Sequence, residues 1–293
     1  MTLRRHKPLR RHKLIASAFA GVAALALFDA AGRAAAPVPR SVADCTGASS
    51  ISGEVASVLD GKSMRLADGR EVRLAAIETP PVATAGPNDG RVDAGLAAKA
   101  ALESLVLGRP IVLRPTAPAP DRYGRLIAYA FITTPAGDSL VQREMLAGGH
   151  VLPSPIAIAP ACRTFLRTAE HTARAGKLGL WGEAYYVVKL ADSPADVLGE
   201  QGRFAVVAGK VASVRESGGI VYVNFGRRWS EAFTVTILKR NERLFTGAGM
   251  TLGQLAGRRV EVRGWVEERN GPAIEVTRPE QIEFVDRELT AKE

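Results

Sequence analysis

The chain has 293 residues, 46% of them hydrophobic and 24% charged, which is enough apolar sequence to bury substantial cores and predicts two domains. Its formal net charge is +9, but seven Lys or Arg residues and a single acid, Asp29, lie within residues 1–36. The remaining residues hold 32 basic and 29 acidic side chains. Most of the excess positive charge lies in the N-terminal segment. The net charge of the chain therefore gives little support for a nucleic-acid partner.

The N-terminal segment has the pattern of a secretory signal. Basic residues precede a largely apolar run, Leu14–Phe28, and small residues follow it. The run is shorter than the roughly 18 apolar residues expected of a membrane span. Residues 1–36 are therefore predicted to be a signal peptide or, if uncleaved, a signal anchor in the inner membrane. The rest of the chain is expected to be exported to the periplasm or secreted, with residues 37–50 as a linker.

Residues 51–185 are predicted to form the first domain. Strands at 51–59, 63–69 and 70–77 are joined by Asp-Gly turns, and a Pro/Gly loop at 78–91 leads to a helix at 93–108. Strands at 110–115 and 124–132 and helices at 138–149 and 162–181 follow. Five short antiparallel strands with a helix after the third predict a β-rich α+β fold, the five-stranded OB-fold barrel with three helices.

A second domain is predicted at 203–288, after a linker at 186–202. Alternating strands at 203–226, 232–239 and 258–285 are broken by turn signals at 217–219 and 270–271, and residues 243–255 favour a short helix. We expect a second OB-like β-barrel. It mixes basic and aromatic residues, a combination with which OB barrels bind single-stranded nucleic acid, although an aromatic core under a polar face gives the same pattern. These residues are Tyr222, Phe225, Arg227, Arg228, Trp229, Lys239, Arg240, Arg243 and Trp265.

The chain has two cysteines, Cys45 and Cys162. An exported protein meets an oxidising compartment, so a disulfide between them is predicted, the alternative being two buried thiols. A nucleophilic role is not expected, because neither cysteine has a histidine near it in sequence.

Four segments in register resemble the staphylococcal-nuclease-like (thermonuclease) family over about residues 51–181. They are "VLDG" at 58–61, "VRLAAIETP" at 72–80, "DRYGRLIAYAF" at 121–131 and "GLW" at 179–181. The resemblance implies an OB barrel with three helices and hydrolysis of nucleic-acid phosphodiesters. In the family, carboxylates hold a calcium ion, a glutamate activates water and two arginines bind the phosphate, which suits the chemistry of the reaction.

Matched to that pattern, the phosphate-binding arginines fall on Arg73 and Arg125. One metal-binding aspartate falls on Glu78, which would be the single remaining metal ligand, while the other falls on Lys62 and the water-activating glutamate on Pro81. The candidate catalytic residues are therefore Arg73, Glu78 and Arg125, with activity in doubt because two acidic positions are lost. No cofactor is expected, except Ca²⁺ if the family site survives.

The candidate substrate-binding residues are Lys62 and Tyr123. Lys62 could place its ammonium where the metal would lie and pair with Glu78, or it could be a solvated turn lysine. Tyr123 could stack on a base or be a half-buried hairpin tyrosine. Arg73 and Arg125 could bind phosphate, or they could form surface ion pairs with Glu78 and Asp121.

Three functions remain open at this point. The first is an exported, degenerate nuclease homologue that binds phosphate, nucleic acid or a partner without efficient cleavage. The second is an active phosphodiesterase or endonuclease with altered metal dependence. The third is a cell-envelope protein-binding module. The expected partners are therefore single-stranded DNA or RNA, or envelope proteins, with membrane contact only through an uncleaved N-terminus.

Overall fold

A computed structural model describes residues 45, 50–80, 90–135, 137–155, 160–183, 186–228 and 231–285, without the side chains of 90–92, 160 and 161. The predicted signal segment, most of the predicted linker at 37–50, Pro81 and Trp229 lie outside these residues. Among the residues described, no helix is both long and apolar enough to cross a membrane.

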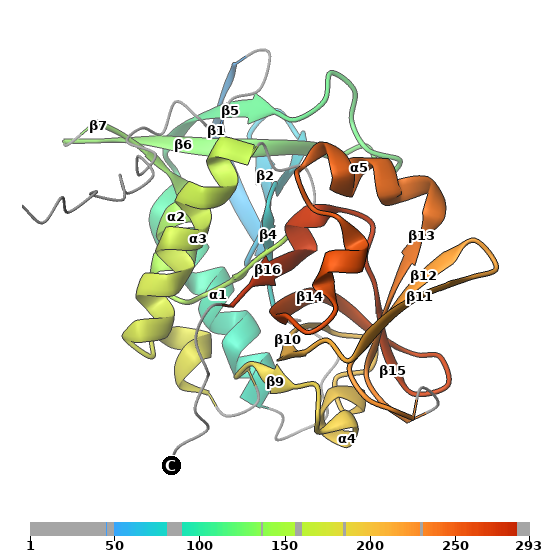
Figure 1. Ribbon diagram of the computed structural model, residues 1–293. Coiled ribbons are helices and arrows are strands. Elements are labelled where there is room, and N and C mark those ends of the chain that lie inside the picture. The colour runs from blue at the N-terminus through green and yellow to red at the C-terminus, as the bar shows by residue number, and fades with distance from the viewer. Residues whose placement is uncertain are drawn as a thin grey trace, which may run out of the picture. The chain divides into compact units, whose positions relative to one another are not determined.

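The first barrel is closed by five strands, as predicted (Figure 1). They are β1 (Ile51–Asp60), β2 (Ser63–Leu66), β3 (Glu71–Leu74), β5 (Pro110–Pro115) and β6 (Leu126–Thr134). Strand β1 is long enough to pair with β2 through its second half and with β5 through its first. Strand β3 pairs in parallel with β6 and closes the barrel, so the expectation of a fully antiparallel barrel is wrong.

Short polar turns set the register of these strands. The Lys62 N–H donates to Asp60 Oδ1 at 2.8 Å, and the Arg70 N–H donates to Asp68 Oδ1 at 3.1 Å. Aspartate favours such turns because its carboxylate replaces a backbone acceptor. Apolar side chains at alternate strand positions then fill the barrel, among them Val55, Met64, Leu66, Val72, Leu74, Ile111 and Leu113.

Helices α1 (Gly90–Val106), α2 (Val141–Ala147) and α3 (Pro160–Ala175) accompany the barrel, and Figure 1 shows α2 and α3 side by side. The predicted helix at 138–149 starts too early, because Gly137–Leu140 form strand β7 against β6. Thr133 Oγ1 donates to Asp138 Oδ1 at 3.0 Å across this hairpin. Aspartate and serine readily make such local contacts and so resist helix formation.

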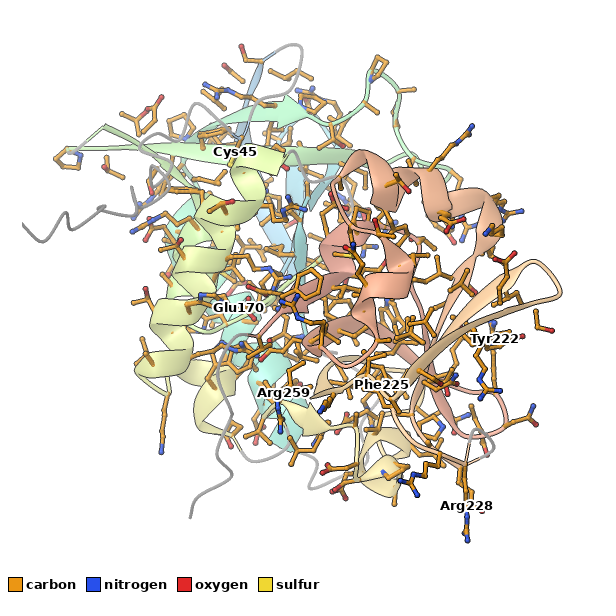
Figure 2. All side chains as sticks on the ribbon, viewed as in Figure 1. Cys45, Glu170, Tyr222, Phe225, Arg228 and Arg259 are labelled. Atoms are coloured by element: carbon orange, nitrogen blue, oxygen red, sulfur yellow. A yellow bond between two sulfur atoms is a disulfide. The ribbon has the colours of Figure 1, made fainter. Side chains whose placement is uncertain are left out.

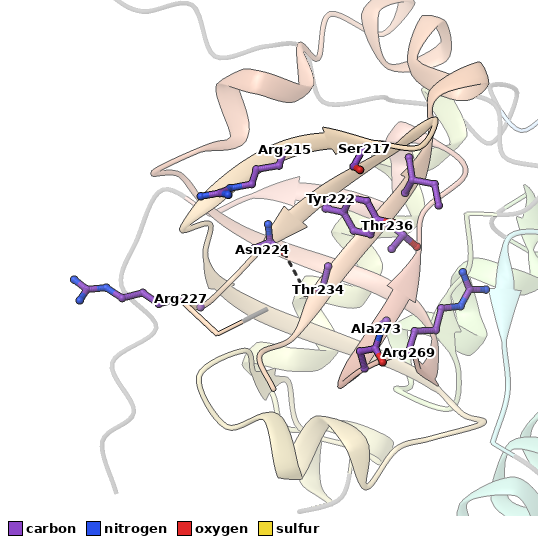
Figure 3. Close-up of a pocket in the computed structure, with 12 residues that line it drawn as sticks. Arg215, Ser217, Tyr222, Asn224, Arg227, Thr234, Thr236, Arg269 and Ala273 are labelled. Carbon is purple, nitrogen blue, oxygen red and sulfur yellow. Dashed lines mark hydrogen bonds between the residues drawn. The ribbon is translucent and has the colours of Figure 1, made fainter. Parts of the chain in front are cut away.

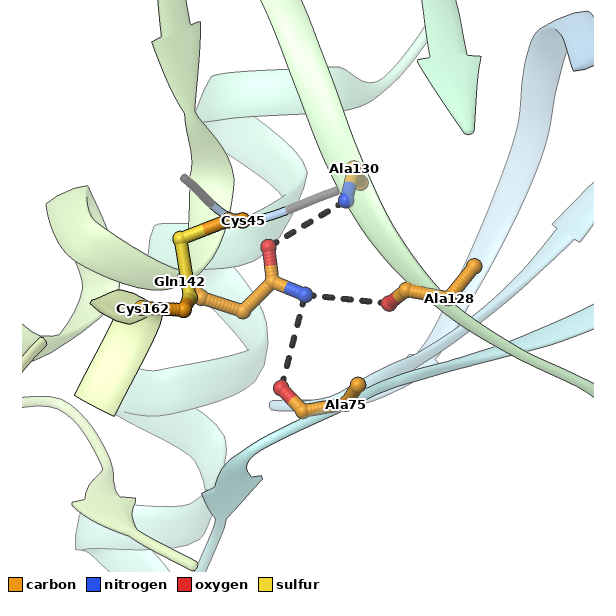
Figure 4. The surroundings of a disulfide bond; sticks show 6 residues. All are labelled: Cys45, Ala75, Ala128, Ala130, Gln142 and Cys162. Atoms are coloured by element: carbon orange, nitrogen blue, oxygen red, sulfur yellow. Dashed lines mark hydrogen bonds between the residues drawn. A yellow bond between two sulfur atoms is a disulfide. The ribbon is translucent and has the colours of Figure 1, made fainter. Parts of the chain in front are cut away.

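The predicted disulfide between Cys45 and Cys162 is confirmed (Figure 4). It ties the chain before β1 to the start of α3. Beside it lies Gln142, which is fully buried. The Gln142 side chain accepts from the Ala130 N–H at 3.2 Å and donates to the Ala128 carbonyl at 3.0 Å. This amide thereby pairs backbone groups that α2 would otherwise bury unsatisfied.

The segment between the barrels is more structured than the predicted linker at 186–202. Strand β9 (Lys189–Leu190) pairs in parallel with β10 (Phe204–Lys210), and α4 (Pro194–Leu198) buries Val197 completely. Two shorter elements, β4 (Ile77–Glu78) and β8 (Leu152–Pro153), pair beside the first barrel, and the 3₁₀ turn η2 (Gly179–Gly182) follows α3.

The second sheet repeats the strand order of the first barrel. Strands β10 and β11 (Ser213–Ser217) are separated by two residues and correspond to the two halves of β1, pairing with β14 and β12 respectively. The parallel β13–β15 pair corresponds to β3–β6. The other strands are β12 (Ile220–Asn224), β13 (Thr234–Leu238), β14 (Arg259–Glu268), β15 (Pro272–Glu275) and β16 (Ile282–Phe284). The helical segments are α5 (Glu242–Gly247) and the turns η3 (Lys239–Asn241), η4 (Leu252–Leu255) and η5 (Pro279–Gln281).

Ion pairs join α3 to the second sheet. Glu170, labelled in Figure 2, is fully buried and accepts from Arg263 Nη1 at 3.2 and 3.3 Å. Arg263 is 1% exposed. Three further pairs surround this one: Arg163 with Glu280, Arg167 with Glu283 and Arg174 with Glu261. The two barrels accordingly belong to one compact unit.

Candidate phosphate-binding site of the first barrel

The turn between β1 and β2 brings Lys62 against Glu78. The Lys62 ammonium contacts Glu78 Oε1, with only 13% of the lysine side chain and 4% of the glutamate side chain exposed. Gly61 makes this turn possible, because a side chain there would collide with the Thr79 hydroxyl and with Ala98 of α1. Of the two alternatives for Lys62, the structure therefore has the pair with Glu78 and not the solvated lysine.

Arg73 on β3 approaches the other side of the same carboxylate. Its Nη2 lies 3.4 Å from Glu78 Oε2, so both carboxylate oxygens face a cation. Burial lowers the pKa of Arg73, and the nearby Arg125 adds to this. Burial, with Arg73 next in importance, also lowers the pKa of Lys62 to about 8, against the opposing effect of Asp60. The contact with Glu78 favours the protonated ammonium.

Arg125 is held by the turn before β6. Asp121 Oδ1 accepts from the backbone N–H groups of Tyr123 and Arg125, and its Oδ2 accepts from Arg125 Nε and Nη2 at 3.0 and 2.8 Å. The Arg125 hydrogen bond lowers the pKa of Asp121 to about 2. Tyr123 is 64% exposed and lies under the guanidinium groups of Arg122 and Arg125, so the half-buried alternative for Tyr123 is wrong.

A cleft of about 780 Å³ opens beside this cluster. Asp60, Lys62 and Glu78 line one part of it. The second sheet supplies another part through Phe204 and Trp265, which pack edge to face with ring centroids 6.3 Å apart. Trp265 is 49% exposed, so a large aromatic surface is available next to a cationic cluster.

Comparison with known families identifies the first barrel. A family model described as staphylococcal nuclease homologue matches residues 71–183, from β3 through η2. The first barrel is a staphylococcal nuclease-like domain. The match ends before the second sheet begins, and comparison with curated proteins gave no match.

The residues of this nuclease-like domain do not fit the calcium ion that the family implies. Ca²⁺ takes about six to eight oxygen ligands. Here both oxygens of Glu78 face cations, and Asp60 Oδ1 accepts from the Lys62 backbone. No group of three or more candidate metal-ligating side chains occurs among the described residues. An ammonium about 4 Å from a divalent cation would cost about 8 kcal/mol at an effective dielectric of about 20.

Sequence reasoning located the nuclease-like cluster but not the cleft beside it. Lys62, Arg73 and Glu78 come together, while Arg125 stands beside them with Asp121 as its partner. The contribution of Trp265 was missed because nothing local in the sequence indicates that β14 lies across from the β1–β2 turn. Phe225, another aromatic residue singled out from the sequence, follows β12, is 9% exposed and belongs to the core.

Proposed function

We propose that this protein is an exported nuclease homologue that binds nucleic-acid phosphodiesters without efficient metal-dependent cleavage. The observation that carries the proposal is the contact between Lys62 and Glu78. An ammonium at this position supplies a positive charge where the resemblance implies a metal ion. The domain thereby keeps attraction for phosphate while losing the ion that would polarise it.

The charges around the site favour an anionic ligand. Lys62 and Arg73 are both partly desolvated, and the positive charges of Arg73 and Arg125 disfavour protonation of their neighbours. A bound phosphate would offset this mutual repulsion and accept charge-assisted hydrogen bonds. Trp265 offers a base the stacking surface that single-stranded ligands use.

Slow cleavage follows from the same arrangement. The Glu78 carboxylate is engaged by Lys62 and Arg73, which makes it a poor proton acceptor for an attacking water. Loss of a positioned general base typically costs roughly 10²–10⁴-fold in rate. We therefore propose no resident metal ion and no efficient hydrolysis.

An active phosphodiesterase with altered metal dependence is the second candidate function. The proximity of Arg73 to Glu78 favours it, since the guanidinium stands 3.4 Å from a carboxylate that lines the cleft. The two candidates differ in whether the bound strand is cut, and one assay separates them.

The test is binding and cleavage of labelled single-stranded DNA and RNA by the full chain, with Ca²⁺, Mg²⁺, Mn²⁺ or a chelator. We expect metal-independent binding, weakened by Arg73→Ala, and little cleavage. The matched control is Arg65→Ala on β2, because Arg65 is half-exposed and pairs with Glu71 away from the cleft. Turnover abolished by Arg73→Ala would establish the second candidate instead, and absence of any nucleic-acid binding would favour the envelope-binding module.

The Lys62→Asp variant tests the role assigned to the ammonium. It restores a carboxylate beside Glu78, so we expect it to gain affinity for Ca²⁺ and to lose metal-independent phosphate binding. Unchanged phosphate binding by Lys62→Asp would contradict the proposal.

We further propose that the mature chain works in the periplasm or outside the cell. The Cys45–Cys162 disulfide supports this, because disulfides persist in oxidising compartments. Cell fractionation, with the mass of the recovered chain, should give a periplasmic or secreted product shortened near residue 36, or an intact chain at the inner membrane if the signal stays uncleaved. Recovery of the intact chain in the cytoplasm with reduced cysteines would contradict export.

A further inference from the structure

The outer face of the second barrel carries a hollow of its own, distinct from the cleft beside Lys62. Strands β11, β12, β13 and β15 form its floor, and the turns at 217–219 and 269–271 flank it (Figure 3). Its volume of about 600 Å³ lies within the range of ligand pockets, which is about 300–1,000 Å³.

The floor of the hollow is polar and partly unsatisfied. Tyr222 and Thr236 face each other across β12 and β13, and Figure 3 shows them side by side. Thr236 is 7% exposed, yet its Oγ1 has no hydrogen-bond partner among the described residues. Beside them, Asn224 accepts from Thr234 Oγ1 at 3.4 Å and donates to Ser213 Oγ at 3.3 Å, which holds its amide in place. A buried hydroxyl without a partner is costly, and a ligand group would satisfy it.

The rim of the hollow is positively charged. Arg215 on β11 and Arg227 after β12 are exposed, and neither forms an ion pair among the residues that the structure describes. Arg269 stands on the opposite side, as Figure 3 shows, and pairs with Glu267 and Glu275 at 2.7 and 3.2 Å. Two cations without acidic partners favour an anionic ligand over a neutral saccharide.

We propose that this hollow binds single-stranded nucleic acid. One base stacks on Tyr222 and hydrogen-bonds to the Thr236 hydroxyl, and Arg215 and Arg227 contact the flanking phosphates. This second site goes beyond the function proposed for the nuclease-like domain and does not depend on it. A strand bound here is recognised by the second barrel whether or not Lys62 and Arg73 bind a phosphate.

The decisive variant is Thr236→Val in the full chain. Valine has the shape of threonine without the unpaired hydroxyl, so the melting temperature should stay the same or rise. Affinity for a fluorescent ten-residue oligothymidylate or oligouridylate should fall about fivefold, as expected for loss of one hydrogen bond. Tyr222→Ala should weaken binding by at least about fivefold through loss of stacking. Unchanged affinity in both variants would overturn the proposal.

The rim arginines are tested by charge reversal with a matched control. Arg215→Glu with Arg227→Glu should weaken oligonucleotide binding and reduce its salt dependence, whereas Arg259→Glu, at an exposed position of β14 outside the hollow, should have little effect. Equal losses from Arg259→Glu would mean a diffuse electrostatic effect and no site. Preferential binding of a sulfated polysaccharide with the same dependence on Arg215 and Arg227 would also overturn the assignment to nucleic acid.

Photocrosslinking separates this site from that of the nuclease-like domain. An oligonucleotide carrying 5-iodouracil should crosslink to the peptide that contains Tyr222, in the wild-type chain and in the Arg73→Ala variant alike. Crosslinks confined to the first barrel and to Trp265 of the cleft would overturn the second site and leave the proposed function intact. Crosslinks to Tyr222 without phosphate binding at Arg73 would support the second site and overturn the proposed function.

Discussion

Removal of Glu170 is expected to be among the most destabilising single changes in the interface between α3 and the second barrel. Arg263 is 1% exposed, and its described hydrogen bonds from the guanidinium all go to Glu170. The Coulomb attraction of two unit charges 3.2 Å apart is about 5 kcal/mol at an effective dielectric of about 20. Glu170→Met leaves this buried cation with only the more distant carboxylates of Glu283 at 3.6 Å and Glu261 at 3.9 Å, and it should cost about 3–5 kcal/mol.

The reverse change should cost less, because a carboxyl left without Arg263 can take up a proton, whereas arginine stays charged. Without Arg263, Glu170 keeps Arg167 at 3.3 Å and Arg174 at 3.8 Å. Arg263→Met should therefore cost about 1–2 kcal/mol. The double variant should be more stable than Glu170→Met alone, because no buried charge is then left unpaired.

Urea unfolding followed by circular dichroism measures these free energies of unfolding. The measurement belongs at about pH 8, because burial raises the pKa of Glu170 to about 7, against the opposing effects of Arg167 and Arg174, so the carboxylate is largely ionised there. The raised pKa also means that stability from this group falls as the pH rises from about 4.5 to about 7. A matched surface change, Glu103→Met on α1, should cost little. A cost below about 1 kcal/mol for Glu170→Met, or a larger cost for Arg263→Met, would refute this reasoning.

Three further predictions concern the first barrel. Phosphate affinity should fall as the pH rises from about 7 to about 9, because Lys62 has its pKa lowered to about 8 mainly by burial, and titration calorimetry of Lys62→Gln should show weaker binding without this dependence. Replacing Cys45 and Cys162 by serine should lower the free energy of unfolding by about 4–5 kcal/mol in the chain-entropy model, and an unchanged melting temperature would contradict this. Gln142→Met should cost about 1–3 kcal/mol by leaving the Ala130 N–H unpaired, and equal amide-exchange protection at Ala130 in variant and wild type would argue against it.

Local signals explain why much of the fold could be predicted. The Asp-Gly turns at 60–61 and 68–69 are stabilised by hydrogen bonds between residues two apart in the chain. Alternating apolar residues mark which face of a strand is buried. The errors in predicted secondary structure occur where pairing with a strand outside the segment determines its conformation. Gly137–Leu140 became strand β7 because β6 lies alongside it, and the predicted linker at 186–202 gained order from β10.

The candidate site likewise has residues that the sequence predicted and contacts that it left open. The sequence predicted Arg73, Glu78 and Arg125 as site residues because they lie in segments that resemble the nuclease family. It left open whether Lys62 meets Glu78 or solvent, because that depends on the path of β4 beside β8. It did not predict Gln142 as a buried partner of three backbone groups, since a polar residue on a short helix normally faces solvent.

By itself, the sequence determined the order of strands and helices in the first barrel, the cysteines available for a disulfide and a lysine at position 62, where the family resemblance implies an aspartate. These follow from residue type, turn chemistry and periodicity, which act locally. Only the tertiary structure decided that Lys62 neutralises Glu78, that Trp265 borders the same cleft and that the Thr236 hydroxyl, beside Tyr222, has no hydrogen-bond partner among the described residues. Those contacts join strands far apart in the chain, and burial sets their strength, which is a property of the folded molecule alone.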